Sequence, residues 1–377
     1  MTTNALSPMV NWQGRLLAIV TAALAVFGVA AVYGASSILA VQNGALGASF
    51  ALRQLTGVVV GGLGLLVAAR VDYHVWRRSA WPLMLVSLAI LWLPFLPGLR
   101  GLVPEINGAR RWLAIGPVRL QPSEFVKFVV VVWVAMLATK KGETVREFRQ
   151  GVLPFLVIVV PVCVLILFQP NLSTALLTAL VSGIVLFTAG ARIGHFLILL
   201  VAATPVLWHE LVNVQYRLSR MVTFLSSGAE VTEANWQIQQ SLIGIGAGRV
   251  VGVGFGEGLQ KLGYLPLAYS DFIFSTIGEE WGFVGGTVII LLFGLWIWVG
   301  LRIARGAADR FGMLLAVGLT ALVGVTAILH VAVTLALIPT TGLPLPFISF
   351  GRSNLLVSIF SAGVLISIGR AGARARR

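Results

Sequence analysis

The sequence predicts an all-α polytopic membrane protein, and its composition and its patterning both point that way. Of the 377 residues, 58% are hydrophobic and only 11% are charged. The mean hydropathy of the chain is +0.95. Apolar stretches recur along the whole chain, and many approach the roughly 20 residues that a helix needs to cross a bilayer. We therefore expect a single integral membrane domain covering residues 1–377.

The apolar stretches predict about ten transmembrane helices. They lie near residues 16–35, 51–69, 80–97, 122–139, 152–168, 172–190, 196–211, 281–301, 312–336 and 355–369. The first stretch is long for a signal peptide and further spans follow it, so we expect it to remain as a membrane anchor. Cys163 is the only cysteine. The chain therefore has neither a disulfide framework nor a cysteine-based metal site.

The basic residues of the chain are distributed as expected for a membrane protein. The formal net charge of +14 would suit a nucleic-acid partner. However, if both termini are cytoplasmic, the inner loops hold sixteen basic residues and four acidic ones. This asymmetry is the positive-inside pattern, with some attraction to anionic membrane lipids. Nucleic acid is therefore not an expected partner.

Three polar segments, at 98–121, 212–280 and 338–354, fall on the opposite, extracytoplasmic side. They carry no strong signal for regular structure, and loops of such length are more often functional than not. The third is rich in proline and glycine, which predicts a re-entrant wall of a cavity, because irregular backbone at membrane depth must be enclosed by protein. Arg352 in this segment is a candidate ligand contact. We therefore expect the functional site on the extracytoplasmic side.

The first polar segment and the helix after it combine arginines with an acid–base pair. Arg110 and Arg111 precede a helix expected to start at Pro122. Glu124 and Lys127 are three residues apart on that helix, so they can form an ion pair. The pair could simply anchor the helix end, or it could belong to a binding site. Outward arginines suit a diphosphate, and Arg53 with the adjacent Gln54 could join them, although each arginine alone would also serve as an interfacial anchor.

The second polar segment contains a glycine series and ends in a single aspartate. The glycines from Gly244 to Gly258 do not satisfy the G-x-G-x-x-G spacing of a nucleotide-binding turn. They predict instead a tightly turning loop whose backbone approaches helices or a ligand closely. Asp271 follows, between aromatic and aliphatic neighbours. Burial there would raise its pKa, which suits a proton acceptor.

Seven segments, in order along the chain, resemble the SEDS family, which comprises the FtsW and RodA proteins of bacterial cell division and elongation. They are Tyr33–Ser37, Asn107–Lys127, Gln169–Thr174, Gln260–Pro266, Ser270–Phe274, Gly278–Glu280 and Pro339–Asn354. The Gln-Pro-Ser-Glu, Asp-Phe-Ile-Phe and Pro-Thr-Thr-Gly-Leu-Pro-Leu-Pro-Phe-Ile-Ser blocks are the most specific of them. The Tyr33–Ser37 and Gln260–Pro266 segments are more similar to the FtsW branch than to the RodA branch.

The resemblance implies a peptidoglycan glycosyltransferase of the bacterial cytoplasmic membrane. Such an enzyme polymerises lipid II, an undecaprenyl-diphosphate-linked disaccharide-peptide, at the outer face during septal synthesis or elongation. The implied partners are a class B penicillin-binding protein and other proteins of the division or elongation complex. Asp271 is the implied catalytic residue. The substrate-binding candidates are Glu124, Lys127, Arg110, Arg111, Trp112, Arg53, Lys261, Ser349 and Arg352.

The chain departs from the usual family pattern at several positions. Asn171 and Ser173 stand in the block that usually reads Gln-Pro-Asp-Leu-Gly-Thr. Leu267 and Tyr269 replace an acid and a histidine ahead of Asp271. Within the third polar segment, the usual Ser-Tyr-Gly-Gly-Ser-Ser block has become Ser349–Asn354, with an arginine at position 352.

The chemistry of the implied reaction fits these residues. A diphosphate leaves readily once its charge is neutralised, so transfer needs one base and nearby cations, with Asp271 as the base. A divalent cation, Mg²⁺ or Mn²⁺, could share the diphosphate charge, but the sequence shows no dedicated ligand cluster and we assign no metal ligands. Two alternatives remain open: a flippase that carries lipid II outward, and a non-catalytic scaffold for the penicillin-binding protein.

Overall fold

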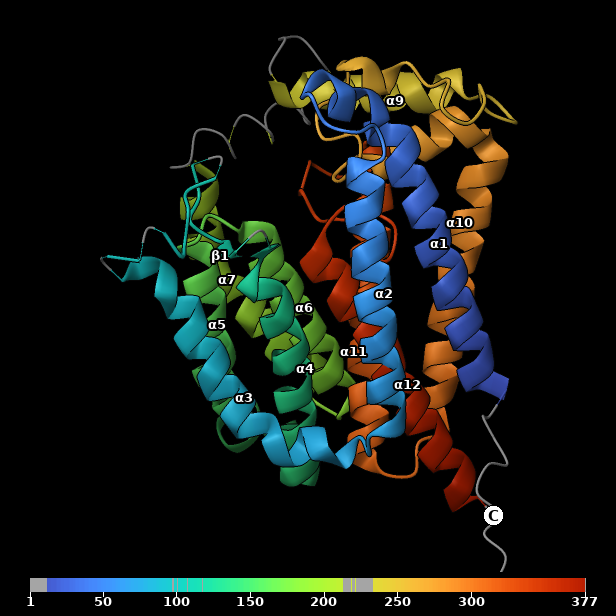
Figure 1. The fold of residues 1–377 in the computed structure, drawn as a ribbon. Coiled ribbons are helices and arrows are strands. Elements are labelled where there is room, and N and C mark those ends of the chain that lie inside the picture. The colour runs from blue at the N-terminus through green and yellow to red at the C-terminus, as the bar shows by residue number, and fades with distance from the viewer. Residues whose placement is uncertain are drawn as a thin grey trace, which may run out of the picture.

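The computed structural model describes residues 12–96, 98–99, 101–106, 108–116, 118–212, 218, 221 and 233–376, and it shows a helical bundle (Figure 1). Its α-helices are α1 (Trp12–Gln42), α2 (Ser49–Arg70), α3 (His74–Trp92), α4 (Pro122–Lys141), α5 (Leu153–Leu167), α6 (Leu172–Thr188), α7 (Ile193–Val212), α9 (Glu233–Ala247), α10 (Ile273–Arg305), α11 (Arg310–Thr334) and α12 (Arg352–Ala375). The predicted all-α fold is confirmed.

The helices account for all ten predicted spans. In the described part of the chain, nine helices are long and apolar enough to cross a membrane. The tenth span corresponds to α6, an apolar helix of 17 residues. That length is at the lower limit for crossing a hydrocarbon core, which is roughly 17 residues. The chain is therefore a multi-pass membrane protein.

The core of the bundle is formed by α4, α11 and α12, most of whose residues are buried. Helix α2 lies against α12 (Figure 1). Their contact is close because Gly57 and Gly61 of α2 face Leu355 and Ile359 of α12. Small residues at such positions let membrane helices approach one another. This contact holds together two helices that both lead into the polar end of the bundle.

Helix α10 begins earlier than the predicted span at 281–301. It starts at Ile273 and is interrupted at Gly282, where the backbone is non-helical (φ 66°, ψ −165°). The predicted span matches the part after this kink. The part before it buries Glu279 and Glu280, so its sequence is too polar for a hydropathy pattern to mark it as helix.

The described part of 212–280 contains a helix, although its sequence carries no strong signal for regular structure. Helix α9 lies across one end of the bundle, beside the start of α10 (Figure 1). Its buried face includes Asn235, Gln237, Gln240 and Ser241, which are polar. An apolar stripe, the usual signal of an amphipathic helix, is therefore missing from the sequence. We call this end of the bundle the α9 end, and the opposite one the C-terminal end.

Two further polar segments also lie at the α9 end. Within 98–121, the strands β1 (Leu113–Ile115) and β2 (Val118–Leu120) pair antiparallel around Gly116, whose φ is +58°. The segment between α11 and α12 is not helical, as its prolines and glycines predicted. Leu345, Phe347 and Ile348 within it are fully buried, so it forms part of the interior.

Candidate active site

Asp271 stands at the entrance to α10, in a turn built by the residues before it. The carbonyl oxygen of Leu267 accepts hydrogen bonds from the backbone N–H groups of Ser270 at 3.0 Å and Asp271 at 3.1 Å. Leu267 adopts a φ of +57°, a backbone conformation that costs energy for a leucine and fixes this turn. The Ser270 hydroxyl donates to Asp271 Oδ1 at 3.1 Å. The carboxylate is half-buried and held in one orientation.

The segment between α11 and α12 packs directly against this turn. Ser349 Oγ donates to the carbonyl of Ser270 at 2.6 Å, and the Phe350 N–H donates to the carbonyl of Tyr269 at 3.0 Å. A Cβ placed on Gly342 would lie 3.5 Å from Asp271 Oδ2, and the φ of Gly342 is +67°. The carboxylate therefore faces a backbone without a side chain, which leaves room beside it for a ligand.

Arg111 is a cation that interacts electrostatically with Asp271. Burial lowers the pKa of Arg111, and the Asp271 carboxylate opposes that shift. Burial also raises the pKa of Tyr269, and the same carboxylate raises it further. The Nε of Arg111 is buried and has no hydrogen-bond partner among the residues that the structure describes. A buried donor without a partner is costly, so it marks a place where a ligand oxygen would be stabilised.

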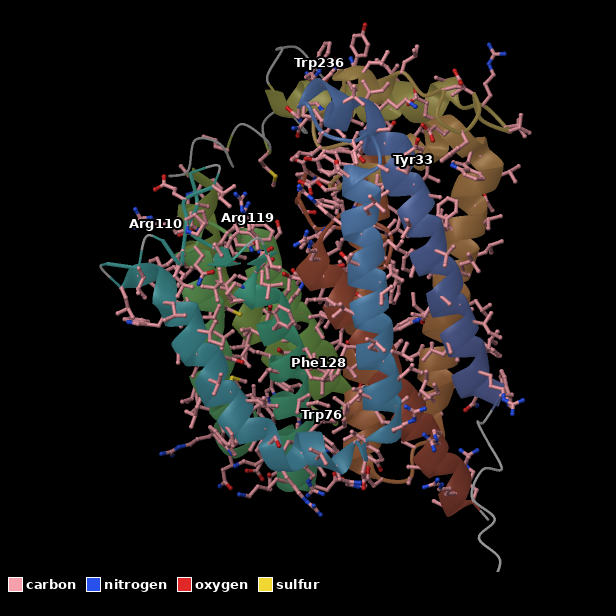
Figure 2. The ribbon with its side chains drawn as sticks, in the orientation of Figure 1. Tyr33, Trp76, Arg110, Arg119, Phe128 and Trp236 are labelled. Carbon is pink, nitrogen blue, oxygen red and sulfur yellow. The ribbon has the colours of Figure 1, made fainter. Side chains whose placement is uncertain are left out.

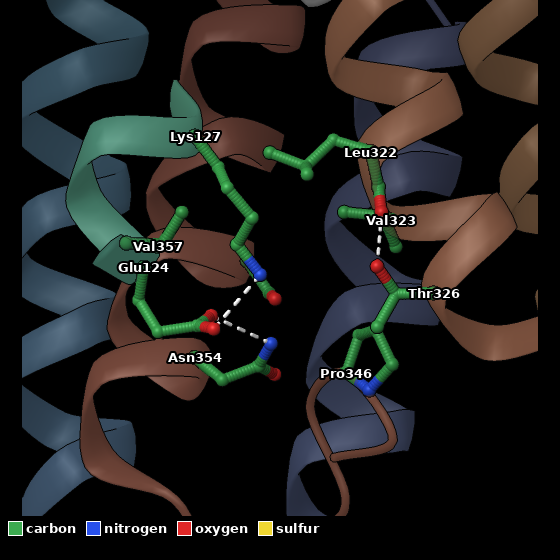
Figure 3. A pocket seen from close by; sticks show the side chains of 9 residues that line it. Glu124, Lys127, Leu322, Val323, Thr326, Pro346, Asn354 and Val357 are labelled. Carbon is green, nitrogen blue, oxygen red and sulfur yellow. Dashed lines mark hydrogen bonds and ion pairs between the residues drawn. The ribbon is translucent and has the colours of Figure 1, made fainter. Parts of the chain in front are cut away.

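Glu124, Lys127 and Asn354 form a second polar cluster between α4 and α12 (Figure 3). Lys127 Nζ lies 2.8 Å from Glu124 Oε1, which confirms the predicted ion pair. Asn354 Nδ2 donates to Glu124 Oε2 at 3.0 Å. The cluster lines a cavity of about 10 Å³ that also touches Thr326 and Pro346. Such a volume holds about one water molecule.

Further hydrogen bonds tie each cluster to neighbouring helices. The Gln121 N–H, just before α4, donates to Ser353 Oγ of α12 at 2.8 Å. Gln54 of α2 donates to the carbonyl of Ser349 at 3.1 Å. Ser349 in turn holds the turn that carries Asp271. Asp271 and Ser349 therefore share one hydrogen-bonded cluster, and Glu124 and Lys127 share the other with Asn354, which lies five residues after Ser349.

The remaining arginines and Trp112 are less enclosed. Arg53 is exposed and lies over the Phe50 ring, with its guanidinium carbon 6.0 Å from the ring centre. Arg110, half-buried, pairs with Glu105 at 3.5 Å and lies at the α9 end (Figure 2). Trp112 and Arg352 are half-buried, and Arg352 begins α12 beside the Ser353 that binds Gln121. Their roles as substrate-binding residues stay predictions.

Lys261 occupies a different environment from the other candidates. It is buried, pairs with Glu280 at 3.3 Å and donates to the carbonyl of Gly256. The neighbouring Glu279 accepts a hydrogen bond from the Leu259 N–H at 2.8 Å. These contacts fasten the glycine-rich segment to the first part of α10. They give the buried Lys261 charge its partners within the protein, and its contact with substrate stays a prediction.

Two buried amides of the site carried no assigned role in the sequence analysis. Gln54, named there only as a neighbour of Arg53, is buried and binds the segment between α11 and α12. Asn354 was noted only as a departure from the family pattern, yet it binds Glu124. A buried amide beside a polar segment was the available signal, because such a group requires partners. No group of three or more His, Cys, Asp or Glu side chains suited to a metal ion occurs among the described residues.

Fold and site together define a multi-pass helical membrane protein with a carboxylate–arginine site at one end of its bundle. A family model described as cell cycle protein, named for FtsW, RodA and SpoVE, matches residues 14–373. The chain belongs to this family, which confirms the resemblance seen in the sequence.

Relatives with known names and structures match nearly the whole chain. A probable peptidoglycan glycosyltransferase FtsW of Trichlorobacter lovleyi is 43% identical over 353 residues, which cover 94% of this chain and 92% of that one. Stage V sporulation protein E of Bacillus subtilis is 36% identical, with 98% and 99% covered. A structure of a peptidoglycan synthase complex that coordinates polymerization and crosslinking matches with a TM-score of 0.75 at 25% identity, covering 94% of this chain and 97% of that one. The RodA structure of Thermus thermophilus matches with a TM-score of 0.68 at 25% identity, covering 94% and 95%.

Proposed function

We propose that this chain is a peptidoglycan glycosyltransferase that polymerises lipid II for septal wall synthesis or for elongation. The observation that carries the proposal is the Asp271 carboxylate, held between the charge of Arg111 and the open backbone of Gly342. The names of the relatives support the enzyme class, and those most similar in sequence support the FtsW branch.

In this proposal the α9 end faces the extracytoplasmic side of the bacterial cytoplasmic membrane, and both termini lie in the cytoplasm. The distribution of basic residues supports this orientation, because Arg70, Arg302 and Arg370 all lie toward the C-terminal end of the bundle. Loops with excess arginine and lysine remain on the cytoplasmic side during insertion. Asp271 would then meet lipid II at the outer face.

The proposed reaction is a single inverting displacement. Asp271 accepts the proton of the acceptor sugar hydroxyl, and the hydroxyl oxygen forms a bond to the anomeric carbon of the donor. The bond from that carbon to the diphosphate breaks, and undecaprenyl diphosphate leaves with the electron pair. Arg111 stabilises the developing negative charge, and its unpartnered Nε supplies a directed donor. A divalent cation, Mg²⁺ or Mn²⁺, brought with the diphosphate would supply further neutralisation.

The proposed role of the second cluster is to support the site. Lys127 is fixed by Glu124, and Glu124 by Asn354, next to a small cavity. A positive charge so placed would attract the substrate's diphosphate. The proposed protein partner is a class B penicillin-binding protein, since a matching structure is a complex that couples polymerization to crosslinking.

The test is glycan polymerisation from labelled lipid II in liposomes, with and without the penicillin-binding protein. We expect polymer from the wild type and a loss of at least about a hundredfold in Asp271→Asn, because the base is removed. Glu147→Gln, which neutralises an exposed carboxylate outside the site, is the matched control and should polymerise normally. Both variants must fold and bind the partner as the wild type does.

Other outcomes would assign another function. Normal polymerisation by Asp271→Asn would remove Asp271 from the base role. Lipid II crossing the liposome bilayer without any polymer would favour the flippase. Partner binding with neither activity would favour the scaffold.

A further inference from the structure

A second depression lies at the C-terminal end of the bundle, far from Asp271. It has a volume of about 580 Å³ and lies between the start of α3 and the end of α4. Its lining consists of Asp72, His74, Arg77, Arg78, Met136 and Lys140. The proposed glycosyl transfer uses none of these residues.

The charge of this pocket is positive. Arg77, Arg78 and Lys140 are exposed and so remain available to a ligand. Asp72 is the one acid of the lining, and its carboxylate already accepts a hydrogen bond from the His74 N–H at 3.0 Å and lies 2.7 Å from His74 Nδ1. Three cations therefore face the depression against one engaged carboxylate.

His74 also ties the pocket to the rest of the bundle. Its Nε2 lies 2.7 Å from Asp309 Oδ2, and Asp309 caps α11 by accepting from the Gly312 N–H at 2.6 Å. The ring thus lies between two carboxylates, one at the start of α3 and one at the start of α11. This bridge fixes the first turn of α3, which carries Arg77 and Arg78, so the basic side chains project from a rigid position.

An apolar stripe continues from the pocket along α3. Arg78, Trp81 and Leu85 are spaced at three and seven residues, so they share one helix face. Trp81 is 47% exposed and Leu85 is 61% exposed. The Trp81 ring meets Trp133 of α4 edge-on at 5.3 Å, and Trp133 lies one turn from the Met136 that lines the pocket. Cation, aromatic ring and aliphatic side chain thus follow one another along the helix, as at the boundary of a bilayer.

We propose that this pocket binds the headgroup of an anionic phospholipid, whose acyl chains lie along the exposed face of α3. Arginine forks and a lysine match a phosphodiester, and basic pockets between transmembrane helices select anionic lipids. A soluble phosphate would engage the cations but not the stripe formed by Trp81 and Leu85. The lipid uses both features, and so it is the ligand that the geometry favours.

The test measures lipid-dependent stabilisation of the full chain. Purified protein is titrated with phosphatidylglycerol, with phosphatidylcholine of the same acyl chains, and with glycerol phosphate. Its Tm is measured at each concentration, and native mass spectrometry counts the lipids that the protein retains. We expect a larger Tm rise with phosphatidylglycerol than with phosphatidylcholine, and none with glycerol phosphate. The variant combining Arg77→Gln, Arg78→Gln and Lys140→Gln should lose about fivefold in affinity per residue.

A control variant that removes the same number of charges elsewhere distinguishes lipid binding in this pocket from general attraction of anionic lipid to the basic surface. Arg149→Gln, Arg192→Gln and Arg374→Gln remove three exposed basic residues outside the pocket and should leave the affinity unchanged. If the triple pocket variant does not fold, Arg78→Gln alone should still weaken binding about fivefold. An equal loss in the control, unchanged affinity in the pocket variants, or stabilisation by glycerol phosphate as strong as that by the lipid would each overturn the proposal.

Discussion

Glu124 and Lys127 illustrate at the residue scale how a structural contact and a functional one can be told apart. Both side chains are almost fully buried, at 3% and 2% exposed. Removing one partner of such a pair leaves a buried charge alone, which costs roughly 3–5 kcal/mol. Replacing both partners with apolar residues of similar volume is often nearly neutral for stability. A pair kept only for anchoring should therefore be replaceable as a unit.

We predict that Glu124→Gln lowers the stability of the protein by roughly 3 kcal/mol, because Lys127 loses its counter-charge. The double variant Glu124→Leu and Lys127→Leu should recover most of that stability while polymerisation stays at least about a hundredfold down. Thermal unfolding and lipid II polymerisation, measured on the same preparations, check both statements. Full activity in the double variant would reduce the pair to an anchor.

Arg111 provides a second prediction at this scale. Replacing Arg111 with glutamine removes the charge beside Asp271 and the buried Nε that lacks a partner. Because that donor is proposed to act on charge that develops during transfer, we expect a drop of about 10²–10³ in kcat with little change in stability. Steady-state polymerisation kinetics would measure it. Arg192→Gln serves as the control and should retain its kcat; an equal drop in both variants would show that general charge is responsible.

At the scale of the element, the glycine-rich segment after α9 acts as a clamp on α10. A Cβ on Gly248 would collide with the carbonyl of Gly278, and one on Gly252 with the carbonyl of Glu280. The Val253 N–H donates to the carbonyl of Glu279 at 3.0 Å. The backbone therefore lies directly on the first part of α10, the part that begins two residues after Asp271. The close approach expected from the glycines is confirmed, and its target is a helix.

Gly252→Ala tests this clamp. The new methyl group meets backbone, and the φ of +88° disfavours any side chain, so we predict a loss of about 1–3 kcal/mol. Gly246, in the last turn of α9, is exposed and has no atom within 4 Å of an added Cβ. Gly246→Ala should therefore be neutral or gain up to about 1 kcal/mol. Thermal unfolding compares the two variants, and equal effects would contradict the clamp.

For the whole molecule, the sequence predicted the membrane-embedded part and missed much of the polar end. Hydropathy located the ten spans because lipid requires each crossing helix to be long and apolar. It failed for α9, since the buried face of this helix includes polar residues such as Gln237, Gln240 and Ser241 in place of an apolar stripe. Polar helices of this kind depend on tertiary partners that a local pattern does not contain.

At the candidate site, the sequence predicted a contact within one helix but not the contacts between distant segments. Glu124 and Lys127 are three residues apart on one helix, and this spacing alone predicts the ion pair that they form. The approach of Arg111 to Asp271, and of Asn354 to Glu124, depends on how α4, α10 and α12 pack. Tyr269, which departs from the family pattern, packs against Phe50, with the two ring centres 5.0 Å apart. The sequence alone did not indicate this contact. Such contacts between distant segments follow from packing, which periodicity does not encode.

The packing of α2 on α12 sets the spacing of the whole site, and Gly363 is where it can be tested. An added Cβ there would lie 2.6 Å from the Leu65 carbonyl oxygen, so Gly363→Ala must push the two helices apart. Overpacking of this kind costs about 1–3 kcal/mol.

Helix α2 carries Gln54, which binds Ser349, and α12 carries Asn354, which binds Glu124. We therefore predict that Gly363→Ala lowers polymerisation as well as Tm. Gly62→Ala on α2, with no atom within 4 Å of the new methyl group, should change neither by much. Normal polymerisation by a destabilised Gly363→Ala protein would contradict this prediction, because it would show that transfer does not depend on the spacing of α2 and α12.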